Sequence, residues 1–581
     1  MNTRSALLGL LLFPAALAGK TGPRADIRAD INRDGTIDLT GDTDVTGKQE
    51  WTECRGAVFL PNIGDTDRRC SKKALSGPPL SNEELDKCND ASDNIQRASD
   101  LMAPVWTVPI LGLPGDAQGF VSVVQKRARE NVRVFRPDGA GWAFVNSTHA
   151  FTKKELERGL KLGVDGRDTR RPNGWDGHAT LRFSIIGKNL NSTDEVHMRV
   201  APVLTHHHLQ SVQQVITVQG NATETPWQKN IPKTSQRPSD IWAQDFMEPG
   251  FANMPGPNGT ISIRIMIRCP QDSRVAGRQL FEYYRKAGVG AVQHLGGARD
   301  EINSGGNIET VPPHNAHGKL WPAGRVILGT HGKQKHHILP YLQAQETQDP
   351  ILLDTDWLAI GHVDEFLQFL PADNDRGWLV VVDDPRAGIQ LLKDLQQAGH
   401  GNIPSISRIN DTQSAPIICE KSFGCDAIPV TPSTITQALD DTELLQINHE
   451  CAKRIDANIE TLKKEVGLTD KDFIHIPSLF KRSELFGDDT QSRKVDAFFP
   501  GVINNLVLTG FNTSIGPNPW GPSINGTDVF AAAIRRKYAD IGIDLVFIDD
   551  WNSHHNYGGE IHCGSNSVRD MSQAWWRNQD G

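Results

Sequence analysis

The chain has 581 residues, too many for one ordinary hydrophobic core, so we expect two or three domains. Its composition, 38% hydrophobic and 23% charged, is that of a soluble globular protein. The formal net charge of -9 excludes a strongly basic chain, so nucleic acid is not an expected partner, and cationic substrates are mildly favoured.

The first residues have the pattern of a secretory signal peptide. Arg4 precedes an apolar run that ends at Ala18, and Ala16 and Ala18 match the small-x-small cleavage rule. The run of about 13 residues is too short to span a bilayer; a buried helix of the mature protein is the alternative. We expect residues 1–18 to be removed, the protein to be secreted and no membrane span to be present. Seven Asn-x-Ser/Thr sequons agree with export: Asn146, Asn191, Asn221, Asn258, Asn410, Asn512 and Asn525.

The cysteines also bear on the compartment. The chain has eight, and some should pair in an oxidising environment. Cys419 and Cys425 are the closest in sequence and form the first candidate pair. No Cys-x-x-Cys is present, so a zinc ribbon is not expected.

The region up to about His197 favours a small β-sandwich, because short apolar or alternating runs are separated by Gly, Pro, Asn and Asp clusters. One helix is expected over Asn82–Met102, where Ser81 and Glu84 have the spacing of a capping box. The expected strands are Gly119–Val124, Asn131–Phe135, His178–Ile186 and Glu195–Val200.

A calcium-type loop lies near the start of this region. Asp30, Asn32, Asp34 and Asp38 occupy positions 1, 3, 5 and 9 of an EF-hand-like pattern, with a glycine at position 6. Gly41 stands at position 12, where an EF-hand has a bidentate Glu, so another acid must supply the missing ligand. The alternative is a solvated acidic turn. The acids nearby in sequence are Asp26, Asp42, Asp44, Asp65 and Asp67.

After about His197 strand-like and helical stretches alternate, which favours an α/β domain. No internal repeat can be recognised in the sequence. The expected strands are Ile261–Arg268, Trp378–Val382, Val502–Thr509 and Leu545–Ile548, and the expected helices are Gln279–Ala287, Ala387–Ala398, Ile435–Val466 and Val529–Ile541.

Three short segments of this half carry groups suited to proton transfer and nucleophilic attack. His362 and Asp364 are two residues apart, so on a strand they would share one face and form a proton-transfer pair. Asp245 lies between Gln244 and Met247, and Cys563 is followed by glycine. Taken singly, each is more often a structural group: a hydrogen-bonded histidine, a helix cap or a buried thiol.

In combination and in this order, the segments resemble the protein-arginine deiminases. The resemblance runs from about Asp26 to the C-terminus and includes Phe480-Lys481, the Ala-Phe-Phe-Pro segment 497–500, and the segment from Asn552 to Asn566 that leads into two tryptophans. It implies an immunoglobulin-like β-sandwich followed by a five-bladed α/β propeller, the pentein fold. We therefore expect a calcium-binding sandwich over residues 19–197 and a catalytic domain over 198–581, without the additional N-terminal domain of animal members.

The resemblance also implies calcium-dependent hydrolysis of peptidyl arginine to citrulline and ammonia, so arginine-containing proteins are the expected partners. Cys563 would be the nucleophile, His362 the acid and base, and Asp245 and Asp364 would hold the guanidinium. Trp242 would form a wall of the arginine tunnel, with a core tryptophan as the alternative. Family members hold the substrate backbone with an arginine, for which Arg274 is the candidate here and Arg278 the alternative.

A calcium ion beside the cleft is implied as well. Its ligands would be the side chains of Gln244, Glu248 and Glu309 and the carbonyls of Gly305 and Ile308. A second family site uses an acid directly after the catalytic aspartate. Phe246 stands there, and Arg268-Cys269-Pro270 replaces Asp-Ser-Pro, so we expect this second site to be missing.

Two alternatives to this function remain. One is a deiminase of the same superfamily acting on free arginine or agmatine; the other is a catalytically inactive, secreted calcium-binding protein. A papain-like protease is not expected, because the histidine precedes the cysteine in the chain. The sequence does not decide the oligomeric state, for which a monomer is the simplest expectation.

Overall fold

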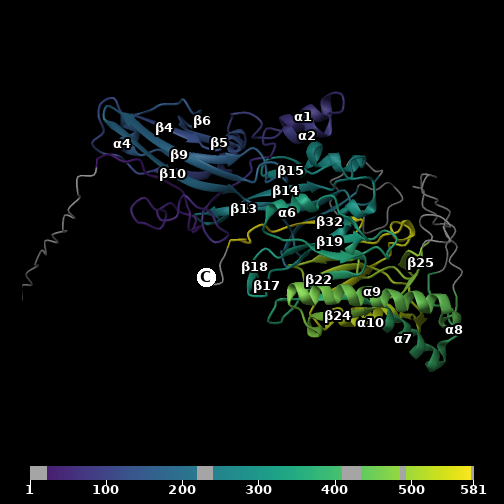
Figure 1. Ribbon diagram of the computed structural model, residues 1–581. Helices are drawn as coiled ribbons and strands as arrows, with labels where there is room; N and C mark the ends of the chain where they lie inside the picture. Colours follow the sequence, from purple (N-terminus) through teal and green to yellow (C-terminus); the bar gives the residue numbers. More distant parts are fainter. Residues whose placement is uncertain (1–21, 219–239, 409–432, 484–492, 577–581) are drawn as a thin grey trace, which may run out of the picture.

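The computed structural model describes residues 22–218, 240–408, 433–483 and 493–576 (Figure 1). Within these ranges the protein is a mixed α+β structure built mostly of strands. The predicted signal peptide lies outside the described residues, as do Cys419 and Cys425. None of the described helices has the length and apolar character needed to cross a bilayer.

The first part of the chain forms two five-stranded sheets. On β9 (His178–Gly187), Leu181, Phe183 and Ile185 are buried, whereas Arg182 between them and Ile186 after them are exposed, the alternation of a strand with one face on a core. Residues of both sheets belong to one hydrophobic core. One sheet has the order β1 (Ile27–Arg28), β3 (Ala103–Thr107), β8 (Lys161–Gly166), β5 (Val132–Asp138) and β6 (Gly141–Phe144). The other has the order β2 (Ala57–Phe59), β10 (Leu190–Val200), β9, β4 (Gln118–Val123) and β7 (Phe151–Thr152).

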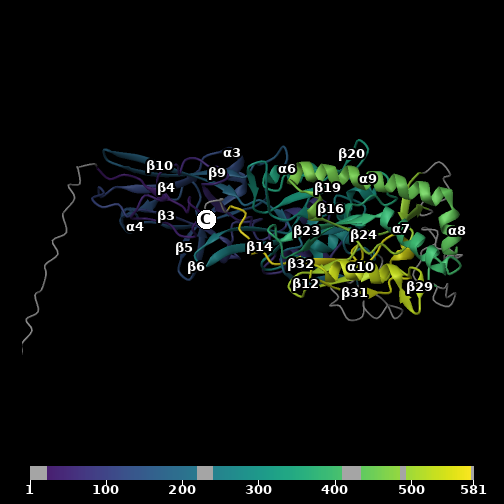
Figure 2. The same ribbon diagram turned by 90° about the horizontal axis from the view of Figure 1, so that it is seen from below.

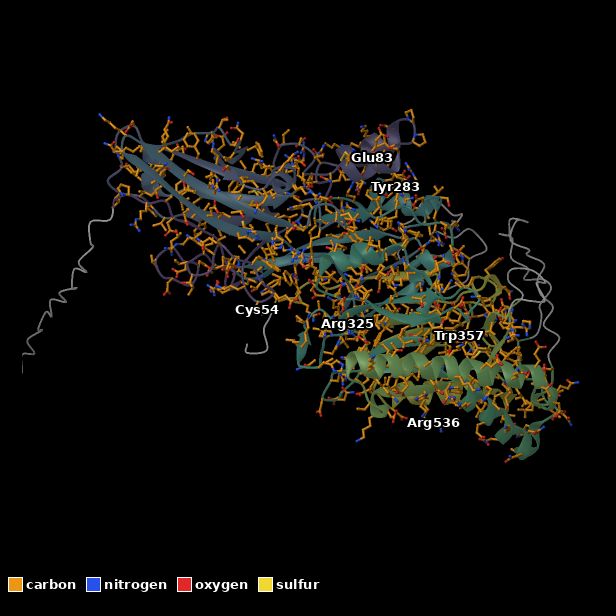
Figure 3. The ribbon with its side chains drawn as sticks, in the orientation of Figure 1. Cys54, Glu83, Tyr283, Arg325, Trp357 and Arg536 are labelled. Atoms are coloured by element: carbon orange, nitrogen blue, oxygen red, sulfur yellow. A yellow bond between two sulfur atoms is a disulfide. The ribbon has the colours of Figure 1, made fainter. Side chains whose placement is uncertain are left out.

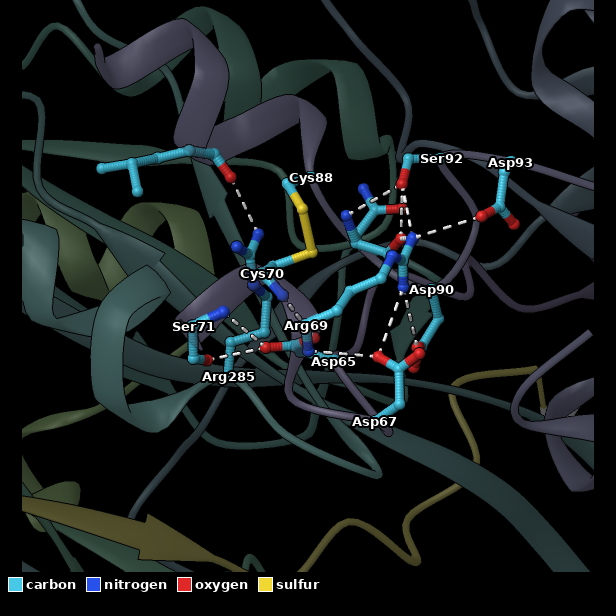
Figure 4. The surroundings of a disulfide bond; sticks show 12 residues. Asp65, Asp67, Arg69, Cys70, Ser71, Cys88, Asp90, Ser92, Asp93 and Arg285 are labelled. Carbon is cyan, nitrogen blue, oxygen red and sulfur yellow. Dashed lines mark hydrogen bonds and ion pairs between the residues drawn. A yellow bond between two sulfur atoms is a disulfide. The ribbon is translucent and has the colours of Figure 1, made fainter. Parts of the chain in front are cut away.

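The strand predictions of this part are confirmed, whereas the predicted helix over Asn82–Met102 is wrong beyond its first turns. Helix α2 covers only Asn82–Lys87; the capping box of Ser81 and Glu84 is present as expected. The chain becomes extended at Cys88, which forms a disulfide with Cys70 (Figure 4). The Asn, Asp and Ser residues that follow favour turns through side-chain bonds to the backbone. The other helices of this part are α1 (Arg69–Ser76), η1 (Ser99–Leu101), α3 (Lys126–Asn131) and α4 (Lys153–Arg158).

The second part contains, within the described residues, four units of the same topology. In each, two antiparallel strands are followed by a third that runs parallel to the second, with helical turns in the connection. The units are β13 (Met247–Gly256), β14 (Gly259–Arg268) and β15 (Val289–Gln293); β16 (Ile308–Val311), β19 (Arg325–His331) and β21 (Ile351–Asp354); β22 (Leu367–Pro371), β23 (Trp378–Asp384) and β24 (Phe473–Pro477); and β27 (Leu506–Leu508), β28 (Thr513–Pro517) and β31 (Asp544–Ile548). The repeat was not recognisable in the sequence.

Short strands and helices complete this part. Strand β11 (Leu204–Thr205) pairs with β13, and β12 (Val212–Thr217) pairs with the last strand, β32 (Ser565–Arg569). The remaining strands are β17 (His314–Ala316), β18 (Lys319–Trp321), β20 (Gln334–Lys335), β25 (Phe480–Arg482), β26 (Val495–Ala497), β29 (Ser523–Ile524) and β30 (Thr527–Asp528). The helices are η2 (Val275–Arg278), η3 (Leu280–Tyr284), η4 (Glu301–Asn303), η5 (Gly305–Asn307), α6 (Leu339–Gln345), η6 (Val363–Glu365), α7 (Pro385–Leu395), η7 (Gln396–His400), α8 (Ile435–Asp440), α9 (Thr442–Val466), η9 (Asp470–Asp472), α10 (Val529–Ala539) and η10 (His555–Tyr557).

Most element predictions of this part are confirmed, with three differences. The expected helix over Gln279–Ala287 is a single π-helical turn, and the expected strand over Val502–Thr509 is shortened to β27. The expected helix over Ile435–Val466 breaks at Asp441, whose carboxylate accepts the backbone N–H groups of Glu443 and Leu444 and so begins α9.

The two parts share one hydrophobic core and lie side by side in both views (Figures 1 and 2). Gly35 has a φ of +88°, and a Cβ atom there would collide with the carbonyl of Gly256 on β13, so only glycine permits this approach. Arg171 donates to the carbonyl of Gln293 at 2.6 Å. Helices α1 and α2 contact η3, near the side chains of Glu83 and Tyr283 in Figure 3.

Candidate active site

The four residues expected to perform chemistry come together from three separate segments of the second part. Asp245 lies in the turn before β13, His362 and Asp364 at the start of η6, and Cys563 in the turn before β32. All four side chains are buried. The expectation of a strand at His362 and Asp364 is wrong, because His362 precedes a 3-10 turn that contains Asp364. The turn still brings both side chains to one site.

His362 faces both aspartates. Its Nε2 donates to the carbonyl of Glu301 at 2.9 Å, which leaves Nδ1 4.0 Å from Oδ1 of Asp245 and 4.0 Å from Oδ1 of Asp364. Burial lowers the pKa of His362, but the charges of the two aspartates outweigh burial, so its pKa is raised above the ordinary value. A protonated imidazole beside two carboxylates can deliver a proton to a leaving group.

The Cys563 thiol lies on the other side of Asp364. Its Sγ is 3.8 Å from Oδ2 of Asp364, and its backbone N–H donates to the side-chain carbonyl of Asn504 at 3.2 Å. Burial and the carboxylates of Asp364 and Asp245 raise the pKa of the thiol well above its ordinary value. These groups therefore disfavour the thiolate in the free protein, and a cation placed between the carboxylates would favour it.

Two carboxylate oxygens of the site have no partner among the described residues. Oδ1 of Asp245 and Oδ1 of Asp364 are buried without a hydrogen bond, as is Nδ1 of His362. Burial raises the pKa of Asp245 to about 6, although Arg274 and His362 oppose the shift. Gly306 packs against the side chains of His362 and Asp364, and a Cβ atom on Gly306 would be 2.6 Å from Nδ1 of His362. Buried acceptors without donors suit a ligand that brings several N–H groups and a positive charge.

The two residues expected to bind substrate lie at the same site. A Cβ atom on Gly559 would be 2.6 Å from the Trp242 ring and 3.1 Å from Cβ of Cys563, so the tryptophan lies close to the thiol. Arg274 is buried and donates to both oxygens of Asp240, at 2.7 and 2.8 Å, and to Oδ2 of Asp245 at 3.5 Å. Its guanidinium is thus bonded to the protein's own carboxylates.

The side chains expected to bind calcium beside the cleft also gather. Gln244, Glu248, Glu309 and Ile308 line one small cavity, and Nε2 of Gln244 is 3.5 Å from the carbonyl of Gly305. Burial raises the pKa of Glu309 to about 7, and burial together with Glu309 raises that of Glu248. The side-chain oxygen of Gln244 is buried without a partner. Two buried acids and an unpartnered amide oxygen fit a hard divalent cation.

The N-terminal loop places its acids differently. Asp30 accepts the backbone N–H groups of Asp34 and Gly35, and Asp38 accepts that of Gly41 at 2.6 Å. Asn32 donates to Asp34 at 2.8 Å. The nearby acid that joins the loop is Asp44, which accepts the N–H groups of residues 31 and 38. No three acids of the described loop place carboxylate oxygens within 4.8 Å of one another, because these oxygens accept hydrogen bonds from the loop's own turns.

Sequence reasoning assigned no role to three residues that contact the catalytic group. Asn504 bonds Cys563 and donates to the carbonyl of Asp364, and the Glu301 carbonyl fixes His362. His562 donates from Nδ1 to Oδ2 of Asp364 at 2.7 Å. The position of His562 next to Cys563 was the available signal in the sequence; nothing in the sequence distinguishes Asn504 or Glu301.

Comparisons with known proteins agree with this geometry. A family model described as protein-arginine deiminase (PAD) matches residues 190–577. Protein-arginine deiminase type-4 of Rattus norvegicus is 32% identical over 97% of this chain and 84% of that protein; the type-4 protein of Homo sapiens is 30% identical with the same coverage. Type-3 of Homo sapiens is 34% identical over 58% of this chain, and that match spans about half of its length (48%). The chain therefore belongs to the protein-arginine deiminase family of enzymes.

Proposed function

We propose that this protein hydrolyses peptidyl arginine to peptidyl citrulline and ammonia, with Cys563 as nucleophile and calcium as cofactor. The observation that carries the proposal is the pair of carboxylate oxygens on Asp245 and Asp364 that accept no hydrogen bond among the described residues, opposite a thiol and an imidazole. An arginine guanidinium is a planar cation with N–H donors in a fork, which suits two such acceptors.

The reaction follows from the positions of these groups. The guanidinium carbon, held between the two aspartates, is attacked by the Cys563 thiolate, and a tetrahedral adduct forms. His362 gives its proton to one terminal nitrogen, the C–N bond breaks, and ammonia leaves a cationic S-alkylthiouronium. His362 then takes a proton from water, and the hydroxide adds to the same carbon. The C–S bond breaks, which restores the thiolate, and loss of one proton gives neutral citrulline.

The calcium requirement rests on Gln244, Glu248 and Glu309 and on the carbonyls of Gly305 and Ile308. A divalent cation supplies positive charge that favours the ionised form of both buried glutamates. Gln244 and Glu248 lie on either side of Asp245 in the chain. A cation that holds these two ligands in place would therefore also fix Asp245, which faces the substrate in this mechanism. For the N-terminal loop we retain the proposal of a calcium site; its acids must rearrange to surround an ion.

The strand topology supports a pentein fold for the second part. The four repeated units would be joined by the β12–β32 pair as a fifth, formed from both ends of this part, to give a five-bladed propeller. The first part, with its two packed sheets, would be the immunoglobulin-like domain.

We also propose that the protein is secreted and glycosylated. The Cys70–Cys88 disulfide is typical of an oxidising compartment. All five sequon asparagines within the described residues are exposed: Asn146, Asn191, Asn258, Asn512 and Asn525. Expression in a eukaryotic host should deliver to the medium a protein that starts at Gly19 and loses mass on treatment with an N-glycosidase. Retention in the cytosol with Met1 intact would contradict this proposal.

The test of the reaction is citrulline formation from a blocked arginine peptide, with calcium and with a chelator. We expect calcium-stimulated citrulline that falls at least about 1000-fold in Cys563→Ala. Cys451→Ala, which removes another buried thiol from α9, is the matched control and should stay active. Turnover of free arginine or agmatine alone would favour the small-molecule deiminase, and calcium binding without any turnover would leave a binding protein.

A further inference from the structure

Two histidines and a glutamate converge beside the catalytic group. His208 comes from the segment between β11 and β12, Glu309 from β16, and His562 from the turn before β32. All three are buried, and one ligand atom of each lies within 4.8 Å of the other two. Across the residues that the structure describes, no other group of three His, Cys, Asp or Glu side chains is gathered so closely.

Both imidazoles are fixed in the tautomer that a metal requires. Nδ1 of His208 donates to the carbonyl of Phe369 at 3.0 Å, and Nδ1 of His562 donates to Asp364 at 2.7 Å. The lone pair of each ring is therefore on Nε2. Metal-binding histidines have this arrangement, with the second ring nitrogen bonded to a carbonyl or a carboxylate.

The three side chains line a cavity of about 20 Å³, enough for one ion or one water molecule. Glu248 faces the same cavity and adds negative charge. Arg569 also lines it, but its terminal nitrogens donate to the carbonyls of Gln210 and Val507 at 3.0 and 2.9 Å.

We propose that Nε2 of His208, Nε2 of His562 and the carboxylate of Glu309 form a binding site for a divalent transition metal of the zinc type. Two imidazoles and one carboxylate with an open fourth position for water are a common zinc ligand set, whereas calcium prefers six to eight oxygens. Ligands of one zinc ion are about 3.4 Å apart, so small side-chain movements complete the site. Because Glu309 is shared with the proposed calcium site, zinc raises the calcium requirement; this consequence rests on the proposed function.

The test is calorimetric titration with zinc chloride in metal-free buffer, on protein that carries Cys563→Ala so that the thiol cannot bind the metal. We expect one tight zinc ion, lost or weakened at least about 100-fold by His208→Gln. His207→Gln is the matched control, because His207 is buried in the same segment but bonds Gln573 instead. It should bind zinc as tightly as the parent protein.

Equal zinc affinity and stoichiometry in the parent and in His208→Gln would overturn the site. In the active protein, zinc should raise the calcium concentration needed for half-maximal citrulline formation, and His208→Gln should reduce this effect. Tight zinc binding that calcium does not weaken would contradict the sharing of Glu309 but would support the zinc ligands. The two claims can therefore fail separately.

Discussion

At the scale of residues, the charge around Cys563 decides when the enzyme can act. Burial, together with the carboxylates of Asp364 and Asp245, raises the pKa of the Cys563 thiol and so makes the thiolate unfavourable in the free protein. A guanidinium held by the same aspartates reverses this balance, so the thiolate forms where a substrate is already in place. In the proposed mechanism such coupling would protect the thiol from unproductive oxidation, because the thiolate is the reactive form.

Arg274 belongs to the same charged group, and its replacement by lysine tests its role. Lysine keeps the charge but loses the paired bonds to Asp240 and the contact with Asp245. We expect Arg274→Lys to lower kcat/KM at least about 10-fold, or about 1.4 kcal/mol, by equal factors for a peptide and for a short blocked arginine.

The control for this substitution is Arg278→Lys. Arg278 bonds Glu282 and the carbonyl of Leu80, away from the aspartates, and should change kcat/KM less than about 3-fold. A loss confined to the peptide would instead place Arg274 on the substrate backbone. Unchanged kinetics with both substrates would contradict any role in the site.

The sequence predicted a candidate site of Asp245, His362, Asp364 and Cys563 because the types and order of these residues are specific, and the structure brings the four together, although one supporting argument was wrong. His362 and Asp364 meet through a 3-10 turn and not on a strand. Asn504 could not be predicted, since an asparagine has many structural uses and only the folded chain brings it to Cys563.

At the scale of elements, the Cys70–Cys88 disulfide ties α1 to the end of α2. Asp65 accepts from the N–H groups of Cys70 and Ser71, and Arg285 of the second part donates to the carbonyl of Leu85 at 2.9 Å (Figure 4). Without the bond, a loop that is closed over 18 residues regains freedom in the unfolded state.

We expect Cys70→Ser with Cys88→Ser to destabilise this segment by about 2–4 kcal/mol. Backbone amides of residues 69–90 should then exchange with deuterium at least about 30-fold faster. Cys54→Ser is the control, because Cys54 is exposed and unpaired (Figure 3) and should not alter exchange there. Equal exchange in the double variant and the parent would show that the hydrogen bonds alone hold the segment.

Element types were easier to predict than element lengths. Short apolar or alternating runs identified β9, which buries alternate residues, and an apolar run identified β14, which buries successive ones. Helix α2 ends at Cys88 of the disulfide, and α8 ends where the Asp441 side chain caps the start of α9. Both features override the helical periodicity of the sequence. The four repeated units escaped recognition because they share strand order and direction but no recognisable sequence.

At the scale of the whole molecule, the contact between Gly35 and Gly256 joins the two parts through backbone atoms. We expect Gly35→Ala to lower the free energy of unfolding at least about 1.5 kcal/mol more than Gly112→Ala does. Both glycines have positive φ, but a Cβ atom on Gly112 meets nothing within 4 Å. The free energy of unfolding should be measured by chemical denaturation in EDTA, which removes any contribution of a cation bound by the N-terminal loop that contains Gly35. Equal destabilisation by the two substitutions would show that the contact with Gly256 does not restrict residue 35 to glycine.

The pairing of β12 with β32 has a consequence for biosynthesis. About 350 residues separate Thr217 from Ser565, so at about 5–20 residues per second the ribosome completes β32 roughly 20–70 s after β12. During this interval β12 lacks its partner, and an open strand edge can recruit other chains. Cys563 lies directly before β32 in the chain, so it is made after all four repeated units. With Cys563 as the proposed nucleophile, a nascent chain cannot modify arginines of its neighbours before residue 563 has been made.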